Sequence, residues 1–132
     1  MKVLLSIKPE FADRIFKGEK RFEFRKAIFK NRDVDEIYVY VTAPVKLIVG
    51  KFSATKIHCD TPSNIWIMGH EYAGIDEEGF FEYFDGKDTA YAIEIGDTTL
   101  FQTPINPKDV MEKFVPPQSF YYLDEKTAQL CT

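Results

Sequence analysis

Gly18-Glu19-Lys20-Arg21-Phe22-Glu23-Phe24-Arg25-Lys26 is the segment around which we expect the chain to be organised. Its two phenylalanines alternate with charged residues, which is typical of a strand with one face in the core. The other face is ionic, because Glu23 stands between Arg21 and Arg25. A carboxylate flanked by two guanidiniums offers a ligand one acceptor and a fixed set of donors. The alternative is a solvated strand face whose charges pair with one another.

The residues before this stretch predict a strand and a short helix that lead into it. Residues 2–7 are almost continuously apolar, which predicts a buried strand. Pro9 suits the first turn of a helix, and apolar residues recur at helical spacing from 11 to 16. Gly18 suits the left-handed position just past a helix. We therefore expect a helix over residues 9–17 that delivers the chain into the alternating strand.

The rest of the chain predicts short strands interleaved with short helices. Further strands are expected over residues 36–42, 46–57 (with a bulge or bend at Gly50), 89–95, 98–102 and after Pro116-Pro117. Further helices are expected over residues 63–69, 77–85 and 107–114. Several connections are too short for parallel crossovers. The sequence therefore predicts an α+β fold that is mainly β, a closed barrel of about six strands flanked by short helices.

Length, composition and net charge limit the number of domains and the kinds of ligand that we expect. The chain has 132 residues, of which 45% are hydrophobic, enough for one domain with its own core. The net charge of −4 argues against a strong nonspecific binder of nucleic acids. Positive residues are nevertheless concentrated in the first 32 positions, so one basic pole is expected. We divide the chain into a domain over residues 1–123 and a tail over 124–132, which is either one weak helical turn or disordered.

Several classes of protein are disfavoured. Two cysteines make no disulfide framework, and no signal peptide or membrane-spanning run is visible, so we expect a cytoplasmic protein that does not enter a membrane. His58-Cys59-Asp60 is compact, but adjacent residues on a strand point to opposite faces. Because paired ligand spacing is missing, we expect neither a metal nor a cofactor.

Three motifs together resemble the ASCH domain (activating signal cointegrator homology), a branch of the PUA-like group of small β-barrels. They are Ser6-Ile7-Lys8-Pro9, then Gly18-x-Lys20-x-x-Glu23-x-Arg25, then Pro116-Pro117-Gln118-Ser119-Phe120. The resemblance covers residues 1–123 and is to a compact prokaryotic branch in which this domain forms the whole chain. It implies a cleft beside the Gly-x-Lys motif that binds RNA or nucleotides.

Some members of this group are enzymes. One branch resembles amidohydrolases that deacylate a modified cytidine, and another shows ribonuclease activity. Lys20 stands where the amidohydrolase branch has its lysine, whereas Glu23 stands where that branch has a threonine nucleophile. A carboxylate cannot be the same nucleophile.

The residues themselves suggest one pocket for a nucleotide. Its expected members are Ser6, Lys8, Lys20, Glu23, Arg25, Tyr40, Gln118, Ser119 and Phe120. Arg25 is suited to holding a phosphate, and Glu23 to accepting a hydrogen bond from an exocyclic amine. Tyr40, Phe120 or Trp66 would stack on the base, and Gln118 and Ser119 would contact a polar edge.

Three functions remain open from the sequence. The first is a binding module for single-stranded RNA or a nucleotide-scale ligand. The second is a small hydrolase that acts on RNA or a modified nucleoside with Lys20 and Glu23 as catalytic residues. The third is a regulatory or protein-interaction domain without ligand chemistry. The oligomeric state, monomer or homodimer, is also open.

Overall fold

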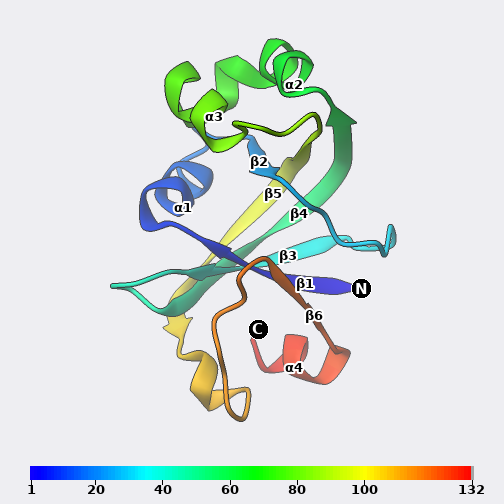
Figure 1. Ribbon diagram of the computed structural model, residues 1–132. Coiled ribbons are helices and arrows are strands. Elements are labelled where there is room, and N and C mark those ends of the chain that lie inside the picture. The colour runs from blue at the N-terminus through cyan, green and yellow to red at the C-terminus, as the bar shows by residue number, and fades with distance from the viewer. Residues whose placement is uncertain (132) are drawn as a thin grey trace.

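A six-stranded mixed sheet runs through the centre of the molecule (Figure 1). The computed structural model describes residues 1–131. In chain order its elements are β1 (Lys2–Ile7), α1 (Pro9–Phe16), β2 (Phe22–Arg25), β3 (Glu36–Val41), β4 (Leu47–Asp60), α2 (Pro62–Gly69), η1 (His70–Tyr72), α3 (Glu77–Tyr83), β5 (Ala90–Ile105), η2 (Pro107–Asp109), β6 (Phe120–Leu123) and α4 (Glu125–Leu130).

The strand order is β2-β5-β4-β3-β1-β6. β1 and β3 are parallel, and every other neighbouring pair is antiparallel. The six strands and the α+β class are confirmed, but the sheet is not closed into the predicted barrel. β2 and β6 form its two edges, and among residues 1–131 no strand pairing joins them; across that gap the Arg25 side chain donates to the backbone carbonyl of Ser119 instead. β4 and β5 supply the curvature, because their register shifts at several points, one of them at Gly50 as predicted.

Three apolar clusters hold the layers together. The main cluster packs α1 against the sheet and contains the fully buried residues Val3, Ile15 and Ile37. The second lies on the opposite face of the sheet and includes Tyr40 and residues of α4. The third fills the space beneath α2 and α3. The alternation of side chains along β3 divides its residues between the first two clusters, because consecutive side chains point to opposite faces.

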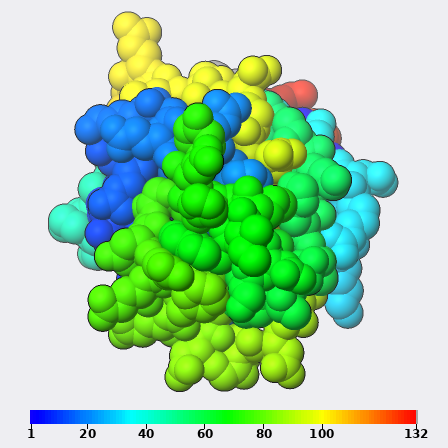
Figure 2. All heavy atoms as spheres, turned by 90° about the horizontal axis from the view of Figure 1, so that it is seen from above, coloured from blue at the N-terminus to red at the C-terminus, as the bar shows by residue number. Residues whose placement is uncertain are grey.

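Two helices form where capping residues predict them. Thr61 caps α2 by accepting from the backbone of Asn64, and Asp76 caps α3 by accepting from Gly79. Figure 2 looks down on these helices (green) and shows their side chains beside those of the N-terminal part of the chain (blue). The third expected helix, over residues 107–114, is wrong: only the single turn η2 forms.

The chain after η2 is irregular because its apolar residues, Val110, Met111 and Phe114, pack individually onto the second cluster. The expected strands over 89–95 and 98–102 are one continuous strand, β5. Within the tail, residues 125–130 form α4, whose Ala128 is buried in the same cluster, so this helix packs against the sheet of residues 1–123.

Candidate functional site

A pocket of about 380 Å³ opens between α1, β2, α3 and the segment that precedes β6. We call this the site pocket, and we call residues 115–119 the strap. The site pocket is lined by Ser6, Ile7, Lys8, Phe11, Lys20, Glu23, Phe24, Arg25, Thr42, Ile75, Phe80, Tyr83, Pro116, Pro117 and Gln118. The pocket therefore has the general form of a small-ligand site, a mostly apolar hollow with a few convergent polar groups.

Lys20 is the buried cation of this pocket. Gly18, with φ of 80°, ends α1, and the backbone amides of Glu19 and Lys20 both donate to the carbonyl of Arg14. This turn sends the Lys20 side chain inward, where only 3% of the residue is exposed. Its Nζ donates to the carbonyl of Ala73 at 2.7 Å. The same Nζ lies 4.6 Å from the centroid of the Phe24 ring.

Burial makes the Lys20 amine unusually acidic. Loss of hydration lowers its pKa from 10.5 to about 8, the nearby Glu23 carboxylate opposes this shift, and the Arg14 guanidinium adds to it. Near pH 8 a sizeable fraction of the side chain is therefore neutral. A neutral amine in a pocket can accept a proton, and the protonated form can stabilise a developing negative charge.

Glu23 and Arg25 lie on β2 at the open edge of the sheet. Arg25 Nη1 donates to Glu23 Oε2 at 3.2 Å and to the carbonyl of Ser6 at 3.2 Å, while Nη2 donates to the carbonyl of Ser119 at 2.9 Å. Ser6 Oγ also donates to the carbonyl of Pro117 at 2.7 Å. Arg25 thus ties β2 to β1 and to the strap where no ladder joins them. Glu23 keeps its Oε1 without a hydrogen-bond donor from residues 1–131 and faces the pocket.

Aromatic rings form the apolar wall. Phe24 and Phe80 meet edge to face, with centroids 5.0 Å apart. Tyr83 lines the rim and is 38% exposed. The ammonium of Lys26 lies over the Tyr83 ring, 4.6 Å from its centroid. Burial raises the pKa of the Tyr83 phenol, so this hydroxyl stays protonated at neutral pH.

The structure brings together six of the nine predicted site residues. Those that line the site pocket are Ser6, Lys8, Lys20, Glu23, Arg25 and Gln118. Ser119 takes part through its carbonyl, which holds Arg25. Since the guanidinium of Arg25 is engaged in holding the strap, its contact with a phosphate stays a prediction.

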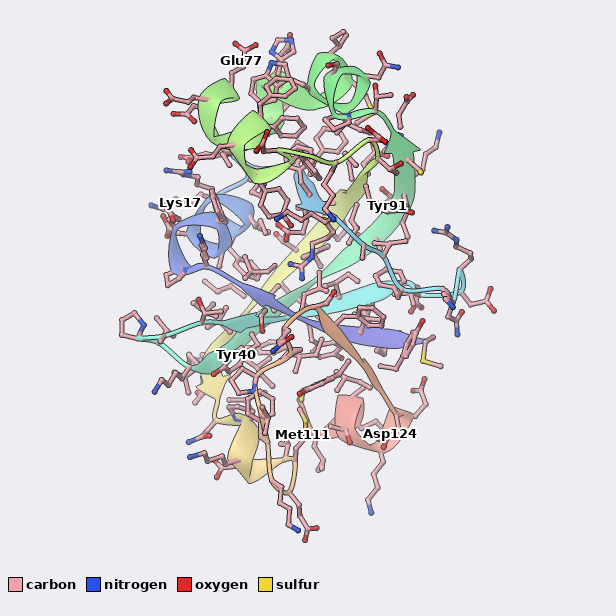
Figure 3. All side chains as sticks on the ribbon, viewed as in Figure 1. Lys17, Tyr40, Glu77, Tyr91, Met111 and Asp124 are labelled. Atoms are coloured by element: carbon pink, nitrogen blue, oxygen red, sulfur yellow. The ribbon has the colours of Figure 1, made fainter. Side chains whose placement is uncertain are left out.

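All three predicted stacking residues lie outside the lining of the site pocket. Tyr40 is 2% exposed, and its ring centroid is 5.1 Å from that of Phe114 in the second cluster. Figure 3 shows Tyr40 on the side of the sheet that faces Met111, away from α2 and α3. Phe120 packs on Phe29, at 5.7 Å, beneath the loop between β2 and β3. Trp66 packs on Phe80 in the third cluster.

Within residues 1–131, no three or more histidine, cysteine, aspartate or glutamate side chains come together as they would around a metal ion. None of the helices in that part of the chain is long and apolar enough to cross a membrane.

Known proteins resemble this chain over most of its length. The ASCH domain model matches residues 5–99. The chain belongs to the ASCH domain family. An ASCH domain-containing ribonuclease of Zymomonas mobilis is 30% identical over 132 residues, which cover 96% of this chain and 86% of that protein.

Solved ASCH structures share the whole fold. The crystal structure of ASCH from Zymomonas mobilis superposes with a TM-score of 0.91 at 30% identity, covering 97% of this chain and 91% of that one. Another relative is a large ribosomal subunit protein, uL22, of Ureaplasma parvum, which is 31% identical over 124 residues. The match covers 92% of this chain but 39% of the ribosomal protein, so the ASCH-like part is a minor share of that chain.

Sequence reasoning missed the segment that shapes the site pocket around Lys20. The carbonyl of Ala73 accepts from Lys20, and that of Gly74 accepts from Arg14 at 2.7 Å. Gly74 has φ of 67°, and a Cβ there would lie 2.6 Å from Cβ of Lys20. The signal in the sequence is the glycine itself, because glycine is the usual residue where φ is positive. Tyr83 was also missed, because it lies in a run of aromatics that predicts core.

Replacing Gly74 with alanine is expected to lower the free energy of unfolding by about 2 kcal/mol or more, because it adds backbone strain and a collision with Lys20. Gly86→Ala is the matched control. Gly86 has φ of 77°, but an added Cβ meets nothing within 4 Å, so this variant carries the strain alone. Urea denaturation of both variants measures the difference. Equal losses would show that Gly74 does not press on the lysine.

Proposed function

We propose that this chain binds single-stranded RNA and takes one unstacked nucleotide into the site pocket. The observation that carries the proposal is the pairing of an aromatic wall with two buried charges, Lys20 and Glu23, in one hollow. Its volume of about 380 Å³ lies in the range of sites for small organic ligands. Proteins that recognise RNA by sequence usually stack splayed-out bases on aromatic rings and bind their polar edges. The resemblance to a ribonuclease over nearly the whole chain supports RNA as the ligand class.

The two charges suit the polar edge of a base. The free Oε1 of Glu23 accepts from an exocyclic amine, and Nζ of Lys20 donates to a neighbouring ring nitrogen or carbonyl. Tyr83, at the rim, offers a ring for stacking. Lys8, which also lines the pocket and is exposed, supplies positive charge for the phosphate. An RNA ligand is consistent with the cytoplasmic location that the sequence predicts.

Fluorescence anisotropy with a short labelled oligoribonucleotide tests binding. We expect affinity to fall as salt rises, and we expect Lys8→Ala to weaken binding and reduce the slope of log K against log salt by about 0.7. Lys108→Ala, an exposed lysine on η2, is the control and should change neither quantity. Absence of salt-dependent RNA binding by the wild-type chain would reject the proposal.

RNA cleavage is the second candidate, favoured by the lowered pKa of Lys20 and by the ribonuclease relative. In this reaction the neutral amine of Lys20 takes the proton of a ribose 2′-hydroxyl. The 2′-oxygen attacks the adjacent phosphorus, the bond from phosphorus to the 5′-oxygen breaks, and water protonates the leaving oxygen. Glu23 would orient the base or the ribose.

The pH dependence of cleavage has a definite sign. Because Lys20 must be neutral to accept the proton, the rate should rise about tenfold per pH unit below its pKa of about 8 and level off above it. Gel analysis of a labelled RNA between pH 6 and pH 9.5 measures this profile. An RNA with a 2′-deoxy sugar at the cleaved position is the control and should stay intact. A flat profile would exclude Lys20 as the base.

A further inference from the structure

We propose that single-stranded RNA leaves the site pocket along residues 26–32 and that a flanking base stacks on Tyr122. We call residues 26–32 the basic loop. The proposal rests on the proposed function and extends it from one nucleotide to a track of several nucleotides.

The basic loop begins at the rim of the pocket. Arg25 lines the pocket, and the next residue, Lys26, holds its ammonium over the ring of Tyr83. A phosphate that follows a base in the pocket therefore meets Lys26 first. From there the loop between β2 and β3 runs across the front of the sheet toward the N-terminus (Figure 1).

The charge of the basic loop is uncompensated. It carries Lys26, Lys30 and Arg32, and it contains no acidic residue. All three are exposed, and none forms an ion pair with another of residues 1–131. Asp33 follows directly and is the nearest acid in the sequence. Three cations within seven residues, none of them paired with an acid, are the electrostatic feature that tracks a phosphate backbone.

The loop is anchored, so its cations have defined positions. Phe29 is fully buried in the main cluster, with its ring 5.7 Å from that of Phe120. The backbone amide of Asn31 donates to the hydroxyl of Tyr122 at 3.0 Å. A held surface loses less conformational entropy when it binds a ligand than a mobile one.

Tyr122 is a prepared stacking platform on the edge strand β6. Its ring meets Phe120 edge to face, with centroids 5.3 Å apart, and its hydroxyl is held by Asn31. The residue is 42% exposed, so part of the ring remains open to a base. An exposed aromatic ring beside free cations is the arrangement by which proteins bind single strands without strict sequence choice.

Negative charge at the start of α3 disfavours a path for the RNA backbone over that helix. α3, which forms part of the pocket rim, begins with Glu77 and Glu78, and Figure 3 shows Glu77 at the end of the molecule opposite to α4 and Asp124. A phosphate chain is repelled there and is favoured along the basic loop.

The test compares a dinucleotide and an octanucleotide of 2′-fluoro RNA, which has no 2′-hydroxyl for cleavage, by fluorescence anisotropy. The wild-type chain should bind the octanucleotide more tightly. Lys30→Ala/Arg32→Ala should remove most of this advantage and reduce the salt slope for the octanucleotide by about 1.4, with no change for the dinucleotide. Tyr122→Leu should weaken the octanucleotide alone by at least about fivefold. Lys56→Ala/Lys108→Ala is the control, because both lysines are exposed and lie outside the basic loop.

Thermal unfolding confirms that each variant is folded before its affinity is measured. If the octanucleotide binds no better than the dinucleotide, or if the two loop variants bind it as the wild type does, the track is wrong while the pocket proposal stands. If the wild type binds neither probe, the proposed function fails and the track with it. If the control variant loses as much affinity as the loop variant, binding follows net charge and the track is also wrong.

Discussion

Lys20→Met should lose RNA binding and any RNA cleavage while the chain remains folded. Methionine matches the length of the buried stem but has neither the charge nor the donors of the amine. Loss of a charged donor in a closed site is expected to weaken binding at least about tenfold. If Lys20 acts as a general base, the cleavage rate should fall by a factor on the order of 10² to 10⁴. Anisotropy and gel assays on the same preparations measure both effects.

The stability of Lys20→Met should depend on pH in a specific direction. In the wild type the folded-state pKa of Lys20 is about 8, below its value of 10.5 in the unfolded chain. The unfolded state therefore binds more protons between these two values, and wild-type stability gains on the order of 3 kcal/mol as pH rises through that window. The variant lacks this gain. Relative to the wild type it should be most stable below pH 8 and lose that advantage by pH 10.5.

Lys17→Met is the matched control for this experiment. Lys17 is exposed, and its ammonium pairs with Asp13 at 2.8 Å one helical turn away. Exposed pairs of this kind contribute little to stability, so the control should unfold like the wild type near neutral pH and bind RNA normally. If Lys20→Met binds RNA as tightly as the wild type, Lys20 does not contact the ligand. If the stability difference from the wild type does not change with pH, the lysine does not have the lowered pKa on which the proposed site depends.

The fold was largely predictable from local patterns. Alternation fixes β3, and the proline and glycine around residues 9–18 fix α1, because these signals act within one turn or one pleat. Closure of the sheet was not predictable. It depends on whether the two edge strands β2 and β6, which are distant in sequence, pair with each other. In this chain the Arg25 side chain bridges from β2 to the carbonyl of Ser119, just before β6, and no backbone ladder forms there. The helix over 107–114 failed because tertiary packing of Val110 and Phe114 outweighed local propensity.

The candidate site was partly predictable for the same reason. Lys20, Glu23 and Arg25 share one strand entry, so their spacing alone places them together. Ala73 lies 53 residues after Lys20 and contacts it through a backbone carbonyl, which leaves no chemical signature in a sequence. The neighbouring Gly74 leaves only the absence of a side chain, which does not name Lys20 as the group beside it. For Tyr40 the direction of the side chain was predictable but its surroundings were not. Alternation correctly put it on a second face, but that face belongs to another cluster.

Arg25→Ala is expected to cost about 3 to 5 kcal/mol of the free energy of unfolding, the range for breaking one partner out of a buried ion pair. The Arg25 and Glu23 side chains are 13% and 8% exposed, so the remaining carboxylate would be buried without its cation. The carbonyls of Ser6 and Ser119 would lose their donors as well. Arg25→Lys should recover only part of this loss, because one ammonium cannot span acceptors on three segments as a planar guanidinium does.

A double variant separates the two sources of that loss. In Arg25→Ala/Glu23→Gln the carboxylate that lost its guanidinium partner is removed as well, so the double variant should be more stable than Arg25→Ala by about 1 kcal/mol or more, while the strap stays released from β2. Arg21→Ala, on the same stretch but exposed, is the control and should change stability by less than about 0.5 kcal/mol. Urea denaturation gives all four values. If Arg25→Ala unfolds like the Arg21 control, the open edge of the sheet does not depend on this side chain, and Arg25 is free to contact a phosphate as the sequence predicts.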